Sequence, residues 1–80
     1  MIERNKYGKA IVKATDNGLN GSGVVSFIPD DGYNAPHWAV FVTVPYQPSK
    51  WEYLHADSEE EAIAEAQEIV EYKLSICTFV

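Results

Sequence analysis

The chain has 80 residues, of which 46% are hydrophobic and 22% are charged. This length allows one small domain over residues 1–80, and the composition is that of a globular chain rather than a disordered one. Twelve acidic residues against six basic residues give a formal net charge of −6. Such a charge argues against direct binding to nucleic acid or to an anionic membrane, because both select Lys and Arg.

The cellular location is predicted from two features of the sequence. Cys77 is the only cysteine, so no disulfide can form within the chain, which suits a reducing compartment. The first residues lack the apolar stretch of a signal peptide, and the longest apolar run, residues 38–42, is too short to span a bilayer. We therefore expect a cytoplasmic protein without a membrane segment.

Strands are predicted over most of the first 55 residues. Alternating apolar and β-branched residues indicate strands, and clusters of Gly, Asn, Asp and Pro indicate the turns between them. Two Asn-Gly pairs predict a long turn over 16–23. The expected strands are residues 9–15, 24–28, 38–44 and 51–55, with a loop over 29–36 and a turn bracketed by Pro45 and Pro48.

One long helix is predicted to begin at Ser58, which starts a Ser-x-x-Glu capping box with Glu61. At 100° per residue an apolar arc forms from Ala62, Ile63, Ala66, Ile69 and Val70. Lys73 would fall within that arc, so we expect the helix to end near Tyr72. Residues 74–80 alternate again and predict a closing strand.

This order, ββββαβ, predicts an α+β fold: an antiparallel sheet of four or five strands with one amphipathic helix packed on one face. The edge strands of so small a sheet could also pair two copies, so a homodimer formed by strand pairing is a further expectation. The expected core residues are Val12, Val25, Phe27, Val40, Val42, Leu54, Ala62, Ile63, Ala66, Ile69, Val70 and Ile76.

Few residues point to catalysis or to metal binding. His55 and Asp57 would face the same way on a strand, and His37, Asp30 or Asp31 could complete a site with two His and one carboxylate. Nothing in the sequence brings these segments together. Cys77 lies in a predicted strand, without a neighbouring cation to lower its pKa. We expect no enzyme activity, no metal and no cofactor; a small metal- or thiol-dependent hydrolase is the alternative.

The predicted helix carries a concentrated negative charge. Residues 52–71 contain eight acidic residues and no Lys or Arg. Neighbouring glutamates on one helix face each cost about 0.2–0.5 kcal/mol, so a face selected for stability alone would include lysines. The candidate partner-binding residues, opposite the apolar arc, are Glu60, Glu61, Glu65, Glu68, Glu71 and Tyr72.

This acidic face has two interpretations. It can be a solvated surface that maintains solubility, or it can bind a basic groove on a larger protein. Its carboxylates follow one another every 3–4 Å or so along the helix axis, which is close to the phosphate spacing of one DNA strand. The second interpretation predicts a mimic of nucleic acid.

Residues 38–80 run strand, turn, strand, then the acidic Ala-Asp-Ser-Glu-Glu-Glu-Ala-Ile-Ala-Glu-Ala segment. This order resembles very small phage-encoded inhibitors of host proteins, including the T7-type inhibitor of bacterial RNA polymerase and some anti-CRISPR proteins. The resemblance implies a protein that blocks a functional surface of a larger host protein. It lies in the order of the elements and implies no particular site residue.

A second resemblance is to HicB-type antitoxins. It rests on Pro29-Asp30-Asp31-Gly32-Tyr33, on Val42-Thr43-Val44-Pro45 and on Asp57-Ser58-Glu59-Glu60-Glu61-Ala62. The Pro-Gly-Cys turn of that family is missing from this sequence. This resemblance implies an antitoxin that neutralises a toxin partner, which is the alternative to an acidic inhibitor.

Overall fold

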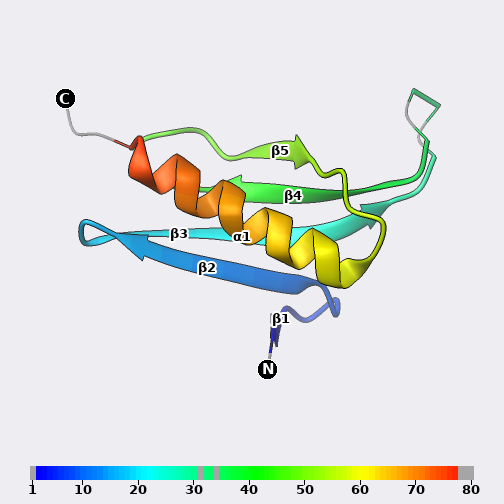
Figure 1. Cartoon of the computed structure of the whole chain (residues 1–80), viewed down its shortest axis with the longest axis horizontal. Helices are drawn as coiled ribbons and strands as arrows, with labels where there is room; N and C mark the ends of the chain where they lie inside the picture. Colours follow the sequence, from blue (N-terminus) through cyan, green and yellow to red (C-terminus); the bar gives the residue numbers. More distant parts are fainter. Residues whose placement is uncertain (1, 31, 34, 78–80) are drawn as a thin grey trace.

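The structure is a computed structural model and describes residues 2–30, 32–33 and 35–77. A single sheet forms one layer and a single helix, α1, crosses it in a second layer (Figure 1). The elements are β1 (Glu3–Arg4), β2 (Ala10–Asp16), β3 (Leu19–Ile28), β4 (His37–Thr43), β5 (Lys50–Tyr53) and α1 (Glu59–Ser75).

The predicted α+β class is confirmed: the sheet has five antiparallel strands and the helix packs on one of its faces. The strands lie in chain order, β1-β2-β3-β4-β5, so each pairs with the next. The fifth strand is β1, at the start of the chain, whereas the sequence predicted a closing strand over 74–80. Leu74 and Ser75 belong to α1 and Ile76–Cys77 form no strand, while residues 78–80 lie outside the described part of the chain.

The hairpin between β2 and β3 is tighter than the predicted turn over 16–23. Asn17 and Gly18 alone make the turn, both with positive φ (52° and 78°), and Asp16 already pairs with Leu19. Consecutive positive φ angles define the two-residue turn that Asn-Gly favours. The remaining glycines of this segment, Gly21 and Gly23, are therefore strand residues rather than turn residues.

Gly21 and Gly23 lie directly beneath α1. A Cβ atom added at Gly23 would stand 2.6 Å from Cγ2 of Val40 and 3.1 Å from Cγ2 of Val70. One added at Gly21 would stand 3.1 Å from side-chain atoms of Leu74 and of Val44. Glycine in a strand interior often marks such a close approach. The missing side chains leave room for the last two turns of the helix.

The helix begins as predicted at Ser58, whose hydroxyl accepts a hydrogen bond from the Glu61 N–H (3.2 Å). It continues to Ser75, beyond the predicted end near Tyr72. Lys73 does not end it, because the Lys73 ammonium reaches Glu52 (3.2 Å) while its aliphatic stem remains largely covered. No helix in the described part of the chain is long and apolar enough to cross a membrane.

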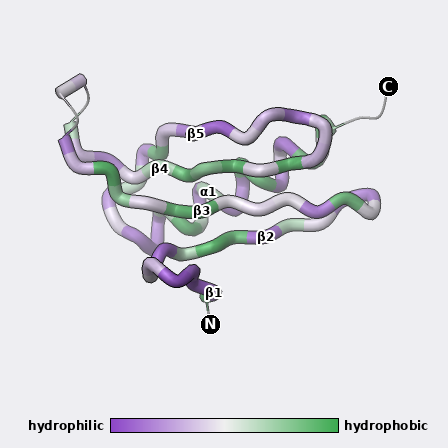
Figure 2. Tube along the Cα trace, turned by 180° about the vertical axis from the view of Figure 1, so that it is seen from behind, coloured by the Kyte–Doolittle hydropathy of each residue, from purple (hydrophilic) through white to green (hydrophobic). Residues whose placement is uncertain are grey.

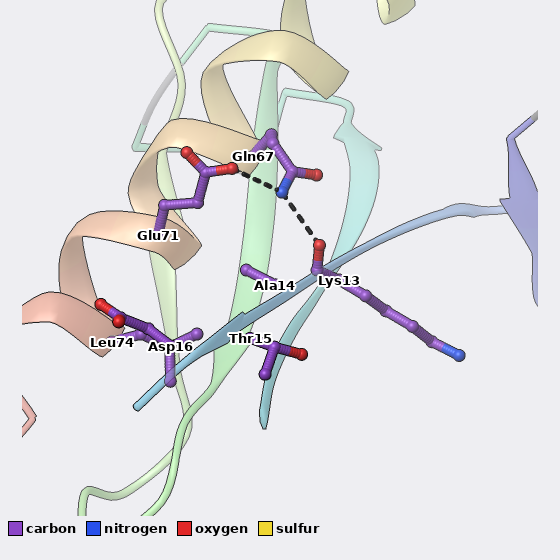
Figure 3. Close-up of a pocket in the computed structure, with 7 residues that line it drawn as sticks. All are labelled: Lys13, Ala14, Thr15, Asp16, Gln67, Glu71 and Leu74. Carbon is purple, nitrogen blue, oxygen red and sulfur yellow. Dashed lines mark hydrogen bonds between the residues drawn. The ribbon is translucent and has the colours of Figure 1, made fainter. Parts of the chain in front are cut away.

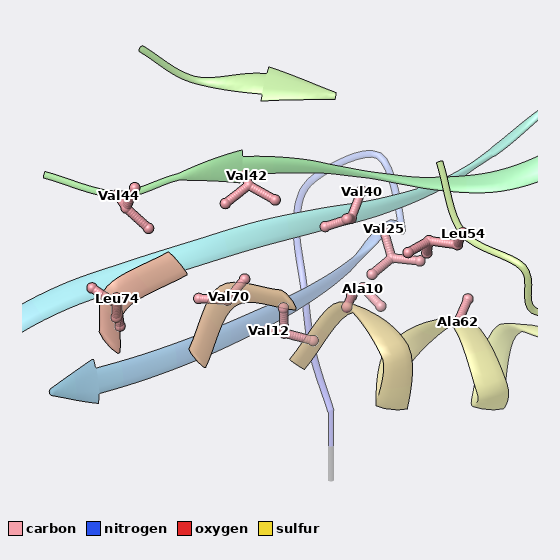
Figure 4. Packing of buried hydrophobic residues seen from close by; sticks show 11 residues of the cluster. Ala10, Val12, Val25, Val40, Val42, Val44, Leu54, Ala62, Val70 and Leu74 are labelled. Carbon is pink, nitrogen blue, oxygen red and sulfur yellow. The ribbon is translucent and has the colours of Figure 1, made fainter. Parts of the chain in front are cut away.

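Small aliphatic side chains form the core between sheet and helix (Figure 4). The helix contributes a buried residue every four positions: Ala62, Ala66, Val70 and Leu74. The fully buried cluster is Ala10, Val12, Val25, Val40, Val42, Val44, Leu54, Ala62, Ala66, Val70 and Leu74. Eight of the twelve predicted core residues belong to this cluster, and Ile63 and Ile69 pack against it.

For two residues the prediction of a core position is wrong, because both are exposed. Phe27 is 49% exposed, because it stands one residue from the end of β3 and its ring packs edge-on against Trp38 (5.2 Å between ring centroids). Ile76 is 51% exposed, because the chain is still helical through Ser75. Continued helical spacing places Leu74, four residues after Val70, in the core instead.

The short strand β1 is tied to the helix by an ion pair. The Arg4 guanidinium donates to both oxygens of Glu59, at 2.7 and 3.1 Å, and also to the Gly8 carbonyl (3.0 Å). The hydrogen bond from Arg4 holds the pKa of Glu59 below its usual value, and the same contact raises the pKa of Arg4. This bidentate pair connects the first strand to the first turn of α1.

We expect Gly23→Ala to destabilise the fold by about 1–3 kcal/mol, since the added methyl group overlaps the Val40 side chain in a packed layer. Without the overlap, replacing Gly by Ala within a strand would stabilise the protein by about 0.5–1 kcal/mol. Urea denaturation followed by tryptophan fluorescence measures the difference. Ser22→Ala, at the neighbouring half-buried position, is the control. A stabilising Gly23→Ala change would contradict the close approach.

We expect Glu59→Gln to loosen β1, because it removes the charge that binds Arg4. Since the pKa of Glu59 is lowered in the folded state, the ion pair stabilises the fold above the ordinary value of 4.5. That contribution is lost as the pH falls through the lowered pKa. Amide exchange at Glu3 and Ile11, which pair across β1 and β2, should therefore be faster in the variant at pH 6. The two proteins should converge in acid. Equal protection at pH 6 would contradict this role, and Glu60→Gln is the control.

Candidate protein-binding surface

The predicted acidic residues lie on the outer side of α1 in two rows. Glu61, Glu65, Glu68 and Tyr72 follow one another at intervals of four, three and four residues, so they form one row along the helix. The second row lies nearer to β2 and consists of Glu60 and Glu71, eleven residues and about three turns apart. We call these six residues the acidic face.

The members of the acidic face differ in what they contact. Glu60, Glu61 and Glu68 are exposed and form no hydrogen bond through their side chains within the described part of the chain. Glu65 is half-buried and its carboxylate accepts from the backbone N–H of His55, at 3.0 and 3.2 Å. Its role is therefore partly structural: it holds the segment that connects β5 to the helix.

No cation of the described residues neutralises the acidic face. The described part of the chain contains four ion pairs, which join Arg4 to Glu59, Lys13 to Glu3, and both Lys50 and Lys73 to Glu52. The cations of these four pairs thus bind carboxylates of β1, of β5 and of the first helical residue. The five carboxylates of the acidic face have no counter-charge among the described residues.

Tyr72 completes the first row and is 64% exposed. An exposed tyrosine next to carboxylates can add apolar contact area and a hydroxyl to an interface, and tyrosine is frequent among the residues that contribute most to binding. The structure thus places the predicted aromatic residue one turn beyond Glu68, at the end of the first row.

A shallow hollow of about 380 Å³ separates the acidic face from the edge of β2 (Figure 3). At its centre the Gln67 amide donates to the Lys13 carbonyl (2.9 Å) and to the Glu71 carboxylate (3.0 Å). Asp16 and Leu74 also line it. The lining thus combines two carboxylates, those of Asp16 and Glu71, with Lys13, whose ammonium pairs with Glu3.

The candidate metal ligands do not converge. No group of three His, Cys, Asp or Glu side chains suited to a metal ion occurs among the described residues, and Asp31 lies outside them. The Nδ1 atom of His37 is 2.9 Å from the Ala35 carbonyl, and its ring stacks on Tyr53. Cys77 is buried, and its Sγ donates to the Pro45 carbonyl (2.8 Å). The fold uses these groups in packing contacts.

The opposite face of the sheet holds a feature that the sequence analysis missed. The helix covers one face only, and Figure 2 shows the other face uncovered. Aromatic rings pair there across β4 and β5: Phe41 with Trp51 (5.2 Å between centroids) and His37 with Tyr53 (4.3 Å). The alternation Trp51-Glu52-Tyr53 could have indicated this cluster, because it places both rings on one side of a strand.

The chain matches no protein-family model, no curated protein and no solved structure. Its function therefore has to be inferred from the geometry and the chemistry of the surfaces themselves.

We expect the carboxylates of the first row to differ in their effect on stability. Glu65→Ala should cost about 1 kcal/mol, because the His55 N–H loses its acceptor. Glu68→Ala should be neutral or stabilising by a few tenths of a kcal/mol, since it removes the repulsion between Glu68 and the glutamates three residues away on either side, Glu65 and Glu71. Urea denaturation measures both. Equal losses of stability in the two variants would show that Glu68 also has a structural role.

Proposed function

We propose that this chain is a small non-enzymatic protein that binds a larger protein through its acidic face and thereby modulates or inhibits it. The observation that supports this most is the set of five helix carboxylates without a cation partner among the described residues. The chain has six basic residues, yet none of their ion pairs is to the outer side of the helix. A complementary basic surface would supply the missing counter-charges.

The spacing of the charges favours a partner surface that handles nucleic acid. From Glu60 to Glu71 the helix rises about 17 Å, which gives one carboxylate every 3–4 Å or so. Phosphates along one DNA strand follow one another about every 3.4 Å of helix axis. A groove built to hold a phosphate backbone would therefore find charges of similar spacing on α1. The protein would act as a mimic of nucleic acid by occupying that groove, much as the small phage inhibitors that its order of elements resembles block a surface of a host protein.

The two kinds of side chain on the acidic face would have different roles. Charges at an interface accelerate the encounter and orient the partners more than they add affinity. Tyr72, exposed at one end of the first row, would supply the anchoring contact. The proposal includes a reducing cytoplasm as the site of action, which a single buried thiol, Cys77, suits.

The test uses charge reversal at two of the three exposed carboxylates that form no other contact, Glu61 and Glu68. Glu61→Lys/Glu68→Lys changes the formal net charge from −6 to −2. The matched control, Asp30→Lys/Asp57→Lys, makes the same change away from the acidic face. Wild type and both variants are immobilised and exposed to lysate of the native source. A specific protein should bind wild type and the control, and should bind the helix variant at least tenfold less, because attraction becomes repulsion.

Two further measurements separate a mimic from a general acidic surface. Binding to wild type should weaken as salt rises from 50 to 500 mM, because exposed charges are screened over about 8 Å at physiological ionic strength. Duplex DNA should compete with wild type for the captured partner. A partner that binds the helix variant and wild type equally would overturn the proposal. So would equal loss of binding in both double variants, which would indicate net charge rather than the acidic face.

A further inference from the structure

The strand β5 forms one edge of the sheet. It is the last strand in the order β1-β2-β3-β4-β5, and within the described residues its outer side pairs with no other strand. The helix packs on β2, β3 and β4 but not on β5, as the position of β5 at the margin of Figure 1 also shows. The edge is therefore accessible to an added strand.

The register shows which backbone groups of β5 point outward. Val40 pairs with Glu52, and the Leu54 N–H donates to the Trp38 carbonyl (3.0 Å). Backbone groups alternate along an antiparallel strand, so those of Glu52 and Leu54 face β4, and those of Trp51 and Tyr53 face outward. The next outward group, the His55 N–H, is taken by the Glu65 carboxylate. Trp51 and Tyr53 thus hold the accessible donors and acceptors of this edge.

The side chains of β5 are complementary to themselves in one antiparallel register. When Trp51 lies opposite Trp51 of a second copy, Lys50 of each chain lies opposite Glu52 of the other. Opposite charges in directly facing positions stabilise a strand pair, and like charges destabilise it. A register centred on Glu52 would place two carboxylates face to face. A register centred on Tyr53 would require the His55 N–H, which Glu65 already occupies.

The aromatic side chains of this edge are held in place before any partner arrives. Trp51 is 53% exposed and packs on Phe41; Tyr53 is 51% exposed and stacks on His37. Because the rings are already ordered, little side-chain freedom would be lost when they are covered. In the register centred on Trp51, the two tryptophans meet on the symmetry axis, on the face of the sheet opposite α1.

We propose that two copies of this chain pair through β5, antiparallel and centred on Trp51, to form one continuous sheet. The symmetry axis of such a pair is perpendicular to the sheet, so both helices lie on the same side and present their acidic faces together. A pairing of one short strand buries less than the roughly 1,600 Å² of a standard interface. The dimer is therefore reversible and depends on concentration. This inference does not depend on the proposed function.

Cysteine crosslinking tests the register. Trp51→Cys and Tyr53→Cys are made in a Cys77→Ser background, where Ser keeps a donor for the Pro45 carbonyl. Directly opposite Cα atoms lie about 5.5 Å apart in a hydrogen-bonded pair, which a disulfide can bridge. The Tyr53 positions of the two copies would be about 14 Å apart. Oxidation should give a covalent dimer with Trp51→Cys and none with Tyr53→Cys. The reverse result would overturn the proposed register.

A charge exchange tests the pairing without new cysteines. Lys50→Glu and Glu52→Lys each place like charges opposite one another in both symmetric positions, so each should raise the dimer dissociation constant about tenfold in sedimentation equilibrium. An equimolar mixture of the two variants restores opposite charges and should dimerise like wild type. Glu52→Lys also removes the contact of Glu52 with Lys73 of its own chain, so circular dichroism is used to show that each variant is folded. If wild type stays monomeric up to about 1 mM, or the mixture associates no better than either variant alone, the proposal is wrong.

Discussion

The close approach of α1 to β3 is the constraint on which the rest of the molecule depends. A Cβ atom at Gly23 would stand 3.1 Å from Val70 of α1 and 2.6 Å from Val40 of β4, so the helix can sit this near to β3 only because the strand has no side chain there. The core is accordingly made of Val, Ala and Leu, and its aromatic residues lie at the margins or on the open face. This packing fixes the rotation of the helix about its axis. That rotation decides which of its glutamates face solvent.

The charges are arranged so that the fold tolerates an acidic helix. Carboxylates in the first turn are favoured by the helix dipole, and Glu59 is also paired with Arg4. Lys73 lies in the last turn, where a cation is favoured, and its ammonium turns away from the acidic face to Glu52. The remaining carboxylates repel one another by a few tenths of a kcal/mol per neighbouring pair. Burial of the apolar stripe outweighs this repulsion, because it stabilises the fold by about 25 cal/mol for each Å² of apolar surface removed from water.

The two sides of the sheet favour two different kinds of association. The helix side presents like charges, which favour an oppositely charged partner and disfavour a second copy of the same surface. The edge and the open face near β5 present aromatic rings, backbone groups and a Lys-x-Glu sequence that is complementary to itself. A dimer through β5 would leave both acidic faces free and on the same side. The two associations are therefore compatible, and a partner with two basic surfaces would gain from both.

The sequence by itself determined the α+β class, the helix start at Ser58 and the helix residues that form the acidic face, because periodicity and capping are local properties. It failed where a residue's role depends on a distant neighbour. Gly21 and Gly23 indicated a turn, yet they make room for α1. Lys73 indicated a helix end, yet Glu52 of β5 accepts its charge. Likewise Glu65 differs from Glu68 only through its contact with His55, and the aromatic pairs of the open face follow from the register of β4 with β5. Only the tertiary structure decides such roles, because each rests on contacts between segments far apart in the chain.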